Sequence, residues 1–168
     1  NVGGITSSNE GNAFTKILSD LRDSGYSITT HKYKLEQYGV PQARHRVIIV
    51  GFRDDVTFNW DNFKHPGKGK KILKDILHTE DGTEREEPPY TFGKQAAVSK
   101  DVIISKKLWA YLKNYKKKHE AKGNGFGFSL VTGSDTTRTL SARYHKDGSE
   151  ILVSRGARKN PRRLTPRE

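Results

Sequence analysis

Three side chains at alternate positions of one short segment could do chemistry on an oxygen-rich ligand. Gln42, Arg44 and Arg46 are separated by single residues. A strand that begins near Gln42, just after Pro41, would therefore place all three on one face. A guanidinium carries five hydrogen-bond donors in a fixed fork and no acceptor, so two of them favour carbonyl, carboxylate or phosphate oxygens as partners. The competing interpretation is a solvated edge-strand face, which any short basic pattern can produce.

The elements that would position this segment can be predicted from its neighbours. A helix is predicted over residues 12–24, because apolar residues recur on one helical face and Gly25 follows as a stop. An alternating strand is expected from Tyr26, and residues 47–50 form a short apolar strand closed by Gly51. Helix, strand and returning strand are typical of the second half of a doubly wound α/β sheet that ends in an antiparallel hairpin.

A second region is predicted to contain short strands and one helix. Alternating apolar residues favour strands around Phe126 to Leu130, Leu140 to Ala142, and Ile151 to Val153. The helix would follow Ser105 as its cap and carry on one face Leu108, Tyr111, Leu112 and Tyr115. Lysines occupy its other side, which is either a solvated surface or a phosphate-binding one.

The composition favours a polyanionic partner. Among the 168 residues, 31 Lys/Arg outnumber 19 Asp/Glu, so the net charge is +12 and the pI is about 9.9. Residues 122–168 hold ten basic and four acidic side chains, a net +6, and are the expected electrostatic footprint of nucleic acid. Cysteine is absent, which excludes disulfides and thiolate metal sites from these residues, and we expect no metal.

The segment YGVPQARHRVIIVGFR, residues 38–53, resembles the QxRxR block of DNA (cytosine-5)-methyltransferases. Two more blocks occur in the family's order. Asn1-Val2 resembles the end of the ENV block, and RLTPRE at residues 163–168 resembles the RxLTPRE block. Residues 124–128, 138–144 and 146–152 are similar to the variable region of bacterial restriction-modification members. The resemblance therefore covers the whole chain.

The resemblance implies an α/β fold: the C-terminal part of a Rossmann-like, S-adenosylmethionine-dependent methyltransferase sheet plus a small, mostly β target recognition domain. We expect residues 1–74 to belong to the catalytic domain and residues 75–155 to form the DNA-binding target recognition domain. Residues 156–168 would return the chain to the catalytic domain. Since the sequence contains no methionine, we also expect a processed or excised piece of a longer protein.

The reaction implied by the resemblance is methyl transfer to C5 of a cytosine flipped out of duplex DNA. In the family a cysteine thiolate attacks C6, S-adenosylmethionine supplies the methyl group, and the second arginine of QxRxR contacts cytosine O2. Arg46 and Arg44 are thus the candidate catalytic residues, Arg44 chiefly by orienting the DNA backbone, with Gln42 as a supporting hydrogen bonder. Asn1 and Val2 would lie near the cofactor. Nucleophile and cofactor loop have no counterpart here, so we expect these residues alone to be inactive and to bind no cofactor.

The other candidate DNA contacts lie in the last third of the chain: Arg138, Thr139, Arg143, Lys146, Arg155, Arg162 and Arg163. Thr139-Leu140 matches a threonine-leucine pair whose hydroxyl contacts phosphate in the family, although threonine is also common in ordinary strands. Phosphate contacts set affinity and arginine–guanine contacts set sequence; which basic residue does which is open. For Arg162 and Arg163, bracing the recognition domain is an equal alternative.

Double-stranded DNA is the expected partner, with a cognate restriction endonuclease as a second, and we expect a monomer. No run of residues approaches the roughly 20 apolar residues that a membrane span needs, and no signal peptide is evident, so a cytoplasmic bacterial protein is expected. The alternative function is a free-standing, sequence-specific DNA-binding module without catalysis. An RNA-binding protein would explain the charge but not the three ordered blocks, and it predicts an aromatic-rich strand that is not visible.

Overall fold

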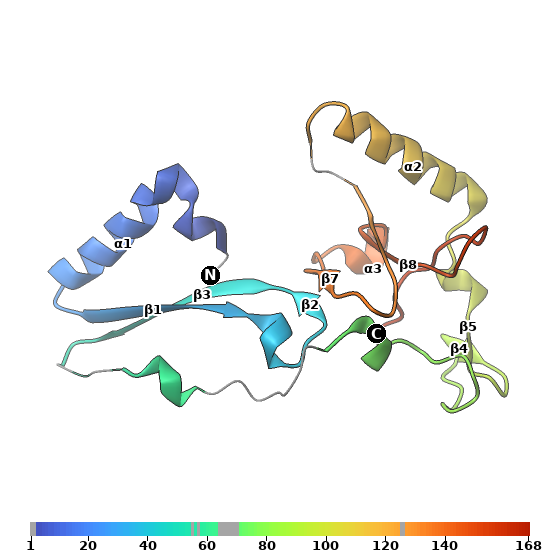
Figure 1. The fold of residues 1–168 in the computed structure, drawn as a ribbon, viewed down its shortest axis with the longest axis horizontal. Coiled ribbons are helices and arrows are strands. Elements are labelled where there is room, and N and C mark those ends of the chain that lie inside the picture. The colour runs from blue at the N-terminus through green and yellow to red at the C-terminus, as the bar shows by residue number, and fades with distance from the viewer. Residues whose placement is uncertain (1–2, 55, 57, 64–70, 125–126) are drawn as a thin grey trace. The chain divides into compact units, whose positions relative to one another are not determined.

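The computed structural model describes residues 3–54, 56, 58–63, 71–124 and 127–168. The chain divides into two compact units, Asn1–Lys70 and Lys71–Glu168, whose α-helices and most of whose strands are labelled in Figure 1. Residues 71–74 and 156–168 group with the second unit. The assignment of the units to catalysis and DNA recognition stays a prediction. Asn1 and Val2, expected near the cofactor, lie outside the described residues.

The first unit contains one α-helix and one long hairpin. Its elements, with η denoting a 3-10 helix, are η1 (Gly3–Thr6), η2 (Ser8–Gly11), α1 (Asn12–Asp23), β1 (Ser27–Lys34), η3 (Leu35–Tyr38), β2 (Gln42–Ala43), β3 (His45–Phe52) and η4 (Trp60–Asn62). α1 confirms the helix predicted from its apolar spacing. It ends as predicted, where the Gly25 N–H donates to Arg22 O at 2.8 Å and the Tyr26 N–H donates to Leu21 O at 3.2 Å.

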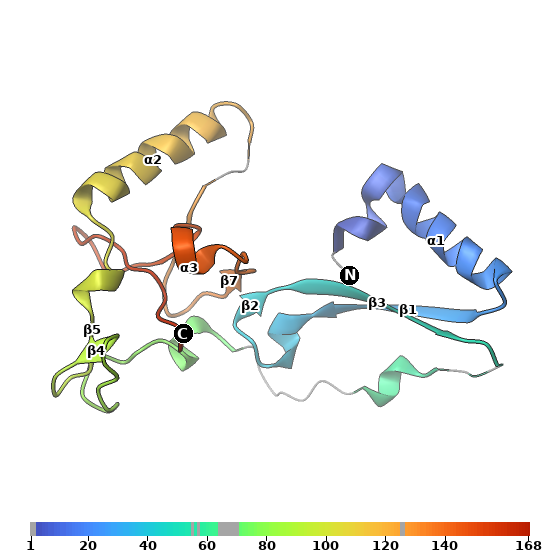
Figure 2. The same cartoon turned by 180° about the vertical axis from the view of Figure 1, so that it is seen from behind.

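The hairpin pairs β1 with β3 in antiparallel register, from Ser27 opposite Phe52 to Lys34 opposite His45. This confirms the predicted strand and returning strand. Val47, in the apolar run, is buried. α1 lies on one side of the hairpin and the segment with η4 on the other (Figures 1 and 2). Because strand residues alternate between faces, the hairpin can contact both layers.

The η4 segment covers its side of the hairpin with aromatic rings. The Trp60 indole Nε1 donates to Thr29 Oγ1 at 2.8 Å, and the Trp60 ring stacks on His31 with ring centroids 5.1 Å apart. Phe58 then meets Trp60 edge to face at 4.7 Å. Aromatic contacts of this kind stabilise β1 of the hairpin on the side that faces η4.

A single strand was predicted from Gln42 through Arg46, but the structure breaks it in two. β2 covers only Gln42 and Ala43, and β3 begins at His45. Between them the Arg44 N–H donates to Gln42 O at 2.9 Å, a three-residue turn that interrupts regular pairing. The expectation of one continuous strand is therefore wrong, and the strand period of two no longer supports a shared face for Gln42, Arg44 and Arg46.

The second unit has one long helix and several very short elements. They are η5 (Leu73–Asp75), β4 (Thr91–Phe92), β5 (Ala97–Val98), η6 (Lys100–Val102), α2 (Lys106–Glu120), β6 (Ser129–Val131), β7 (Thr137–Arg138), α3 (Tyr144–Asp147) and β8 (Ile151–Val153). α2 confirms the predicted helix and its cap, since the Leu108 N–H donates to Ser105 Oγ at 3.1 Å. The expectation of a mostly β unit is wrong: its strands have two or three residues each and much of it is irregular.

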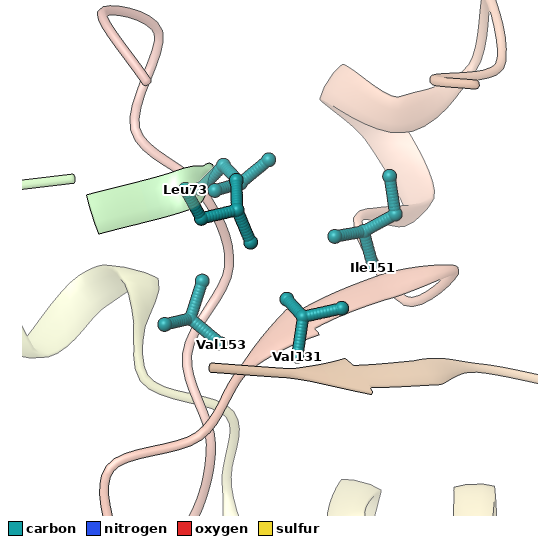
Figure 3. Close-up of a cluster of buried hydrophobic side chains, with 5 residues drawn as sticks. Leu73, Val131, Ile151 and Val153 are labelled. Carbon is teal, nitrogen blue, oxygen red and sulfur yellow. The ribbon is translucent and has the colours of Figure 1, made fainter. Parts of the chain in front are cut away.

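The core of this unit lies around two short parallel strands. β6 pairs with β8, with Ser129 opposite Ile151 and Val131 opposite Val153. Figure 3 shows Val131, Ile151 and Val153 facing Leu73 of η5, and Leu164 completes the buried cluster. Leu152, between the two β8 core residues, is also fully buried. β8 is thus buried on both faces, which is typical of a parallel strand.

The strand expected around Leu140 to Ala142 is absent from this described part of the chain. Instead, Ser141 and Tyr144 are joined in a turn by a 3.2 Å backbone hydrogen bond, and α3 follows. The Ser141 N–H donates to the Glu150 side chain, Oε1, at 2.7 Å. A carboxylate therefore takes the donor that a strand would offer to a neighbouring strand. The strand predicted around Phe126 to Leu130 corresponds in part to β6, while Phe126 itself lies outside the described residues.

Candidate nucleic-acid interface

The hairpin holds Arg46 in a regular ladder. The residue lies in β3 directly opposite Tyr33 of β1 and is half-buried. Its guanidinium Nη1 donates to the carbonyl of His45 at 2.7 Å. A guanidinium has five N–H donors, of which this contact uses one. The backbone position of Arg46 is thus well defined, and its side chain has the chemistry to donate to an oxygen of a ligand.

The residues just before Arg46 are fastened to η3. The Leu35 N–H donates to Arg44 O at 3.0 Å, and His45 Nε2 lies 3.1 Å from Glu36 Oε1. Burial opposes ionisation of Glu36, but backbone hydrogen bonding and His45 outweigh it and hold the pKa of this carboxyl below its usual range. Arg44 is half-buried in the kink and Gln42 precedes it. These contacts fix the backbone at the break between β2 and β3.

The second unit contains a groove of about 700 Å³ that gathers four of the predicted DNA contacts. α2 forms one wall with Leu108, Tyr111, Leu112 and Tyr115. The remaining lining residues come from chain segments that follow α2 in sequence: Gly127, Phe128, Arg138, Ser141, Arg143, Lys146, Ser149, Glu150 and Arg163. α2 lies over β7 and α3 in both ribbon views (Figures 1 and 2).

The four cations reach the groove from three different elements. Arg138 lies in β7, Arg143 caps the start of α3, Lys146 lies within α3, and Arg163 belongs to the C-terminal segment. Arg138 Nη1 is 3.4 Å from Gly127 O, which is a weak contact by distance. Like charges gathered in one concave surface repel one another and attract an anion. The arrangement therefore favours an anionic ligand.

Arg163 is held against Gly148 at the groove. A Cβ on Gly148 would lie 2.6 Å from Arg163 Cδ, so any larger residue at this position would have to displace the Arg163 side chain. Arg163 Nε is buried and has no hydrogen-bond partner among the described residues. The Arg163 backbone is fixed by its N–H, which donates to Val102 O at 2.8 Å. A buried donor without a partner costs free energy, and a ligand oxygen would supply that partner.

Arg162 has a structural role instead. Its side chain is only 3% exposed and forms a forked ion pair with Glu168, with Nη1–Oε2 and Nη2–Oε1 distances of 2.6 and 2.7 Å. Burial of the Glu168 carboxyl opposes its ionisation, but Arg162 outweighs burial and holds the pKa below its usual range. Of the two roles expected for Arg162, bracing is the one that its contacts support, and direct DNA contact is incompatible with its burial.

The C-terminal segment is tied to residue 78 by a polar cluster. Glu168 Oε1 accepts a hydrogen bond from the His78 N–H at 2.8 Å. The buried His78 ring reaches Thr165 Oγ1 at 3.1 Å through Nε2 and Glu84 Oε2 at 2.9 Å through Nδ1. The hydrogen bond from His78 holds the pKa of the Glu84 carboxyl below its usual range. These bonds fix the C-terminal segment, including Arg163, within the second unit.

Other predicted contacts lie outside the groove. Thr139 follows β7 and Arg155 follows β8, and both are half-buried; their DNA contacts stay predictions. Conversely, Tyr111 and Tyr115 line the groove but were expected only as one face of a helix. The signal that could have found them is their aromatic spacing of four residues on a lysine-rich helix, which suits nucleic acid as well as a core.

The described residues form neither a metal site nor a membrane-spanning helix. Among the described residues there is no group of three or more His, Cys, Asp or Glu side chains that could hold a metal ion. In the same part of the chain, no helix combines the length and the apolar character needed to cross a membrane. With Asn1 and Val2 undescribed, we assign no residue of this chain to S-adenosylmethionine.

Comparison with known proteins identifies the relatives of this chain. It is 38% identical over 170 residues to the type II methyltransferase M.DsaV of Dactylococcopsis salina. This match covers 100% of the present chain and 43% of M.DsaV. It is 35% identical over 171 residues to the type II methyltransferase M1.ScrFI of Lactococcus lactis subsp. cremoris, covering 100% and 39%. The chain thus spans less than half the length of these two curated relatives.

The fold and the family agree with this result. The structure matches that of the Dnmt2 methyltransferase of S. pombe with a TM-score of 0.56 and 15% identity, over 95% of this chain and 44% of the other. At that identity the match shows a shared mixed α/β fold alone. The family model described as C-5 cytosine-specific DNA methylase matches residues 1–168. The chain therefore belongs to the C-5 cytosine-specific DNA methylase family.

Proposed function

We propose that this chain is the DNA-contacting part of a bacterial restriction-modification DNA (cytosine-5)-methyltransferase. The observation that carries the proposal is the groove in which four cationic side chains from three parts of the second unit converge, in a chain of this family. In such an enzyme a cytosine is flipped out of duplex DNA and receives a methyl group at C5. S-adenosylmethionine would supply that group to the complete enzyme.

Arg46 is the residue that we assign to cytosine O2. Negative charge grows on the ring as a thiolate adds to C6, so a donor held at O2 stabilises the transition state more than the ground state. The regular pairing of β3 with β1 supports this role, because it fixes the Arg46 backbone. Arg44, in the kink before β3, would orient the DNA backbone, with Gln42 beside it.

The groove residues Arg138, Arg143, Lys146 and Arg163 are the proposed phosphate contacts, and Thr139 and Arg155 would extend them. Phosphate contacts supply most of the affinity of DNA-binding proteins and position the protein on the duplex. The thiolate step needs a cysteine, and these 168 residues contain none. We therefore expect the chain by itself to bind duplex DNA and to transfer no methyl group.

The test is the salt dependence of duplex binding by the 168-residue chain. Neutralising one phosphate contributes about −0.9 to the slope of log affinity against log salt. We expect Arg143→Ala and Lys146→Ala each to make the slope shallower by about that amount. Lys94→Ala is the matched control, because Lys94 is exposed between β4 and β5 and does not line the groove. A chain that binds no duplex at low salt would contradict the proposal.

A further inference from the structure

The α2 wall of the groove is aromatic, which phosphate binding does not explain. Tyr111 and Tyr115 lie four residues apart, with ring centroids 5.7 Å apart and ring planes 17° from parallel. The Tyr115 ring is followed by that of His119, with 4.4 Å between the two ring centroids. Tyr111, at the other end of this row of rings, is 59% exposed. A large ring that is left this exposed in a groove offers a surface on which another flat ring can stack.

Anion-binding groups lie in the same groove as these rings. Arg138, Arg143, Lys146 and Arg163 line it, and Glu150 is the single acidic residue among the described lining residues. The Glu150 carboxylate already accepts from the Ser141 N–H at 2.7 Å. Arg163 Nε is buried without a hydrogen-bond partner among the described residues. The groove therefore combines a net positive charge, a donor that lacks an acceptor and a stacking surface.

A nucleotide is the ligand class that matches all three features. A phosphate satisfies the cations and the Arg163 donor, and a base stacks on the tyrosine, in the manner of proteins that bind single strands. The carboxylates of an acidic peptide could satisfy the cations and the Arg163 donor, but they offer no flat ring to stack on the tyrosine. A volume of about 700 Å³ lies within the range of small-ligand sites. Bases inside a duplex stack on one another, so their faces are closed to a protein ring.

We propose that this groove binds an unpaired nucleotide of DNA, with its base stacked on Tyr111 and its phosphates facing Arg138, Arg143, Lys146 and Arg163. The inference rests on the proposed DNA-binding function and adds to it a site for an exposed base. It assigns α2 a part in recognition, through its tyrosines rather than its lysines.

The test combines removal of the protein ring with removal of the base. The probes are a fluorescein-labelled oligothymidine and an abasic oligonucleotide of equal length, bound to the 168-residue chain at one low salt concentration. We expect Tyr111→Ala to weaken oligothymidine binding about ten- to a hundredfold. The abasic probe should bind the unaltered chain about as weakly as oligothymidine binds Tyr111→Ala. It should lose no further affinity in the variant.

Two variants control for folding and surface loss. Tyr111→Phe keeps the ring and should bind oligothymidine like the unaltered chain. Phe92→Ala removes a 48% exposed ring on β4, outside the groove, and should change nothing. Equal affinity of Tyr111→Ala and the unaltered chain for oligothymidine would overturn the inference. So would losses that are the same for both probes, or a polyglutamate competitor as effective as the oligonucleotide.

The outcomes separate this inference from the proposed function. Duplex binding that depends on Arg143 and Lys146, together with no preference for oligothymidine over the abasic probe, would leave the function standing and overturn the base site. Base-dependent oligothymidine binding without any duplex binding would support the base site and overturn the proposed function. Absence of binding to both kinds of DNA would overturn both.

Discussion

The hairpin that carries Arg46 and the groove that carries Arg143 and Lys146 are built on different physical principles. The hairpin is a continuous antiparallel ladder from Ser27–Phe52 to Lys34–His45, so the backbone of each residue is fixed by its neighbours. The groove joins segments distant in sequence through short elements and side-chain hydrogen bonds. A ladder suits a donor that must be placed to within a fraction of an ångström, as catalysis requires.

A groove assembled from loops suits a different task. Surface connections tolerate changes of sequence and length better than ladders do. Such a groove needs polar contacts to hold its segments together. In the second unit, the buried ion pair between Arg162 and Glu168 is one of these contacts. We therefore expect substitutions in the second unit to change its folding and its DNA affinity, and substitutions of Arg46 to change the methylation rate.

The largest expected effect is on the folding of the second unit. Arg162→Ala would leave the side chain of Glu168, 0% exposed, without its charged partner. Removing one member of a buried ion pair typically costs about 3–5 kcal/mol. Urea unfolding followed by hydrogen exchange should show this loss in residues 71–168, with little change in the hairpin of the first unit.

The surface pair of α1 provides the control for that experiment. Lys16 Nζ lies 2.7 Å from Asp20 Oδ1, but these side chains are 76% and 58% exposed. Lys16→Ala should therefore change the free energy of unfolding far less than Arg162→Ala does, because solvent screens an exposed ion pair. If the two substitutions cost the same, the ion pair does not brace the second unit and the contrast with the hairpin fails.

The next largest effect concerns Arg46. In an active methyltransferase that carries this sequence, Arg46→Ala should lower the single-turnover methylation rate on the order of 100-fold to 1,000-fold. DNA affinity should change little, because charge at cytosine O2 develops only during the reaction. Arg143→Ala should do the reverse, since a phosphate contact is made equally in ground and transition states.

Arg46→Lys is the matched variant, because it keeps the charge and removes the planar fork of donors. It should recover only part of the rate if geometry matters. Loss of affinity with an intact single-turnover rate in Arg46→Ala would instead make Arg46 a residue that positions DNA. The hairpin and the groove would then share one function.

Sequence patterns predicted the hairpin better than the groove for a physical reason. Helical spacing in α1 and the apolar run around Val47 are local signals, and both elements formed where expected. The kink at Arg44 and the loss of a strand at Leu140 depend on hydrogen bonds that the pattern does not encode. The Ser141–Glu150 contact is one example.

The groove itself depends on tertiary structure. Its basic residues could be proposed from charge, but no local pattern separates Arg163, which lines it, from Arg162, which is buried beside it. The tyrosines of α2 were visible as a helical face. The tertiary structure alone shows that these tyrosines share a groove with basic residues from the segment 138–163, because the chain returns past α2.

The smallest expected effect distinguishes backbone strain from groove geometry. Gly148 and Gly156 have φ values of +50° and +91°, in the left-handed region that disfavours other residues by about 1–2 kcal/mol. Alanine at either position should cost about that much stability, measured by urea unfolding. A Cβ at position 148 would also lie 2.7 Å from Arg163 Nε, whereas one at position 156 meets nothing within 4 Å.

The two variants should therefore differ in DNA binding while being similar in stability. Gly148→Ala must displace the Arg163 side chain, and we expect it to weaken duplex binding as much as Arg163→Ala does. Gly156→Ala should bind like the unaltered chain. If both glycine variants bound DNA equally well, the position of Arg163 would not matter for the groove. If both bound equally poorly, the groove would be responding to general loss of stability, and its dependence on one well-placed side chain would be refuted.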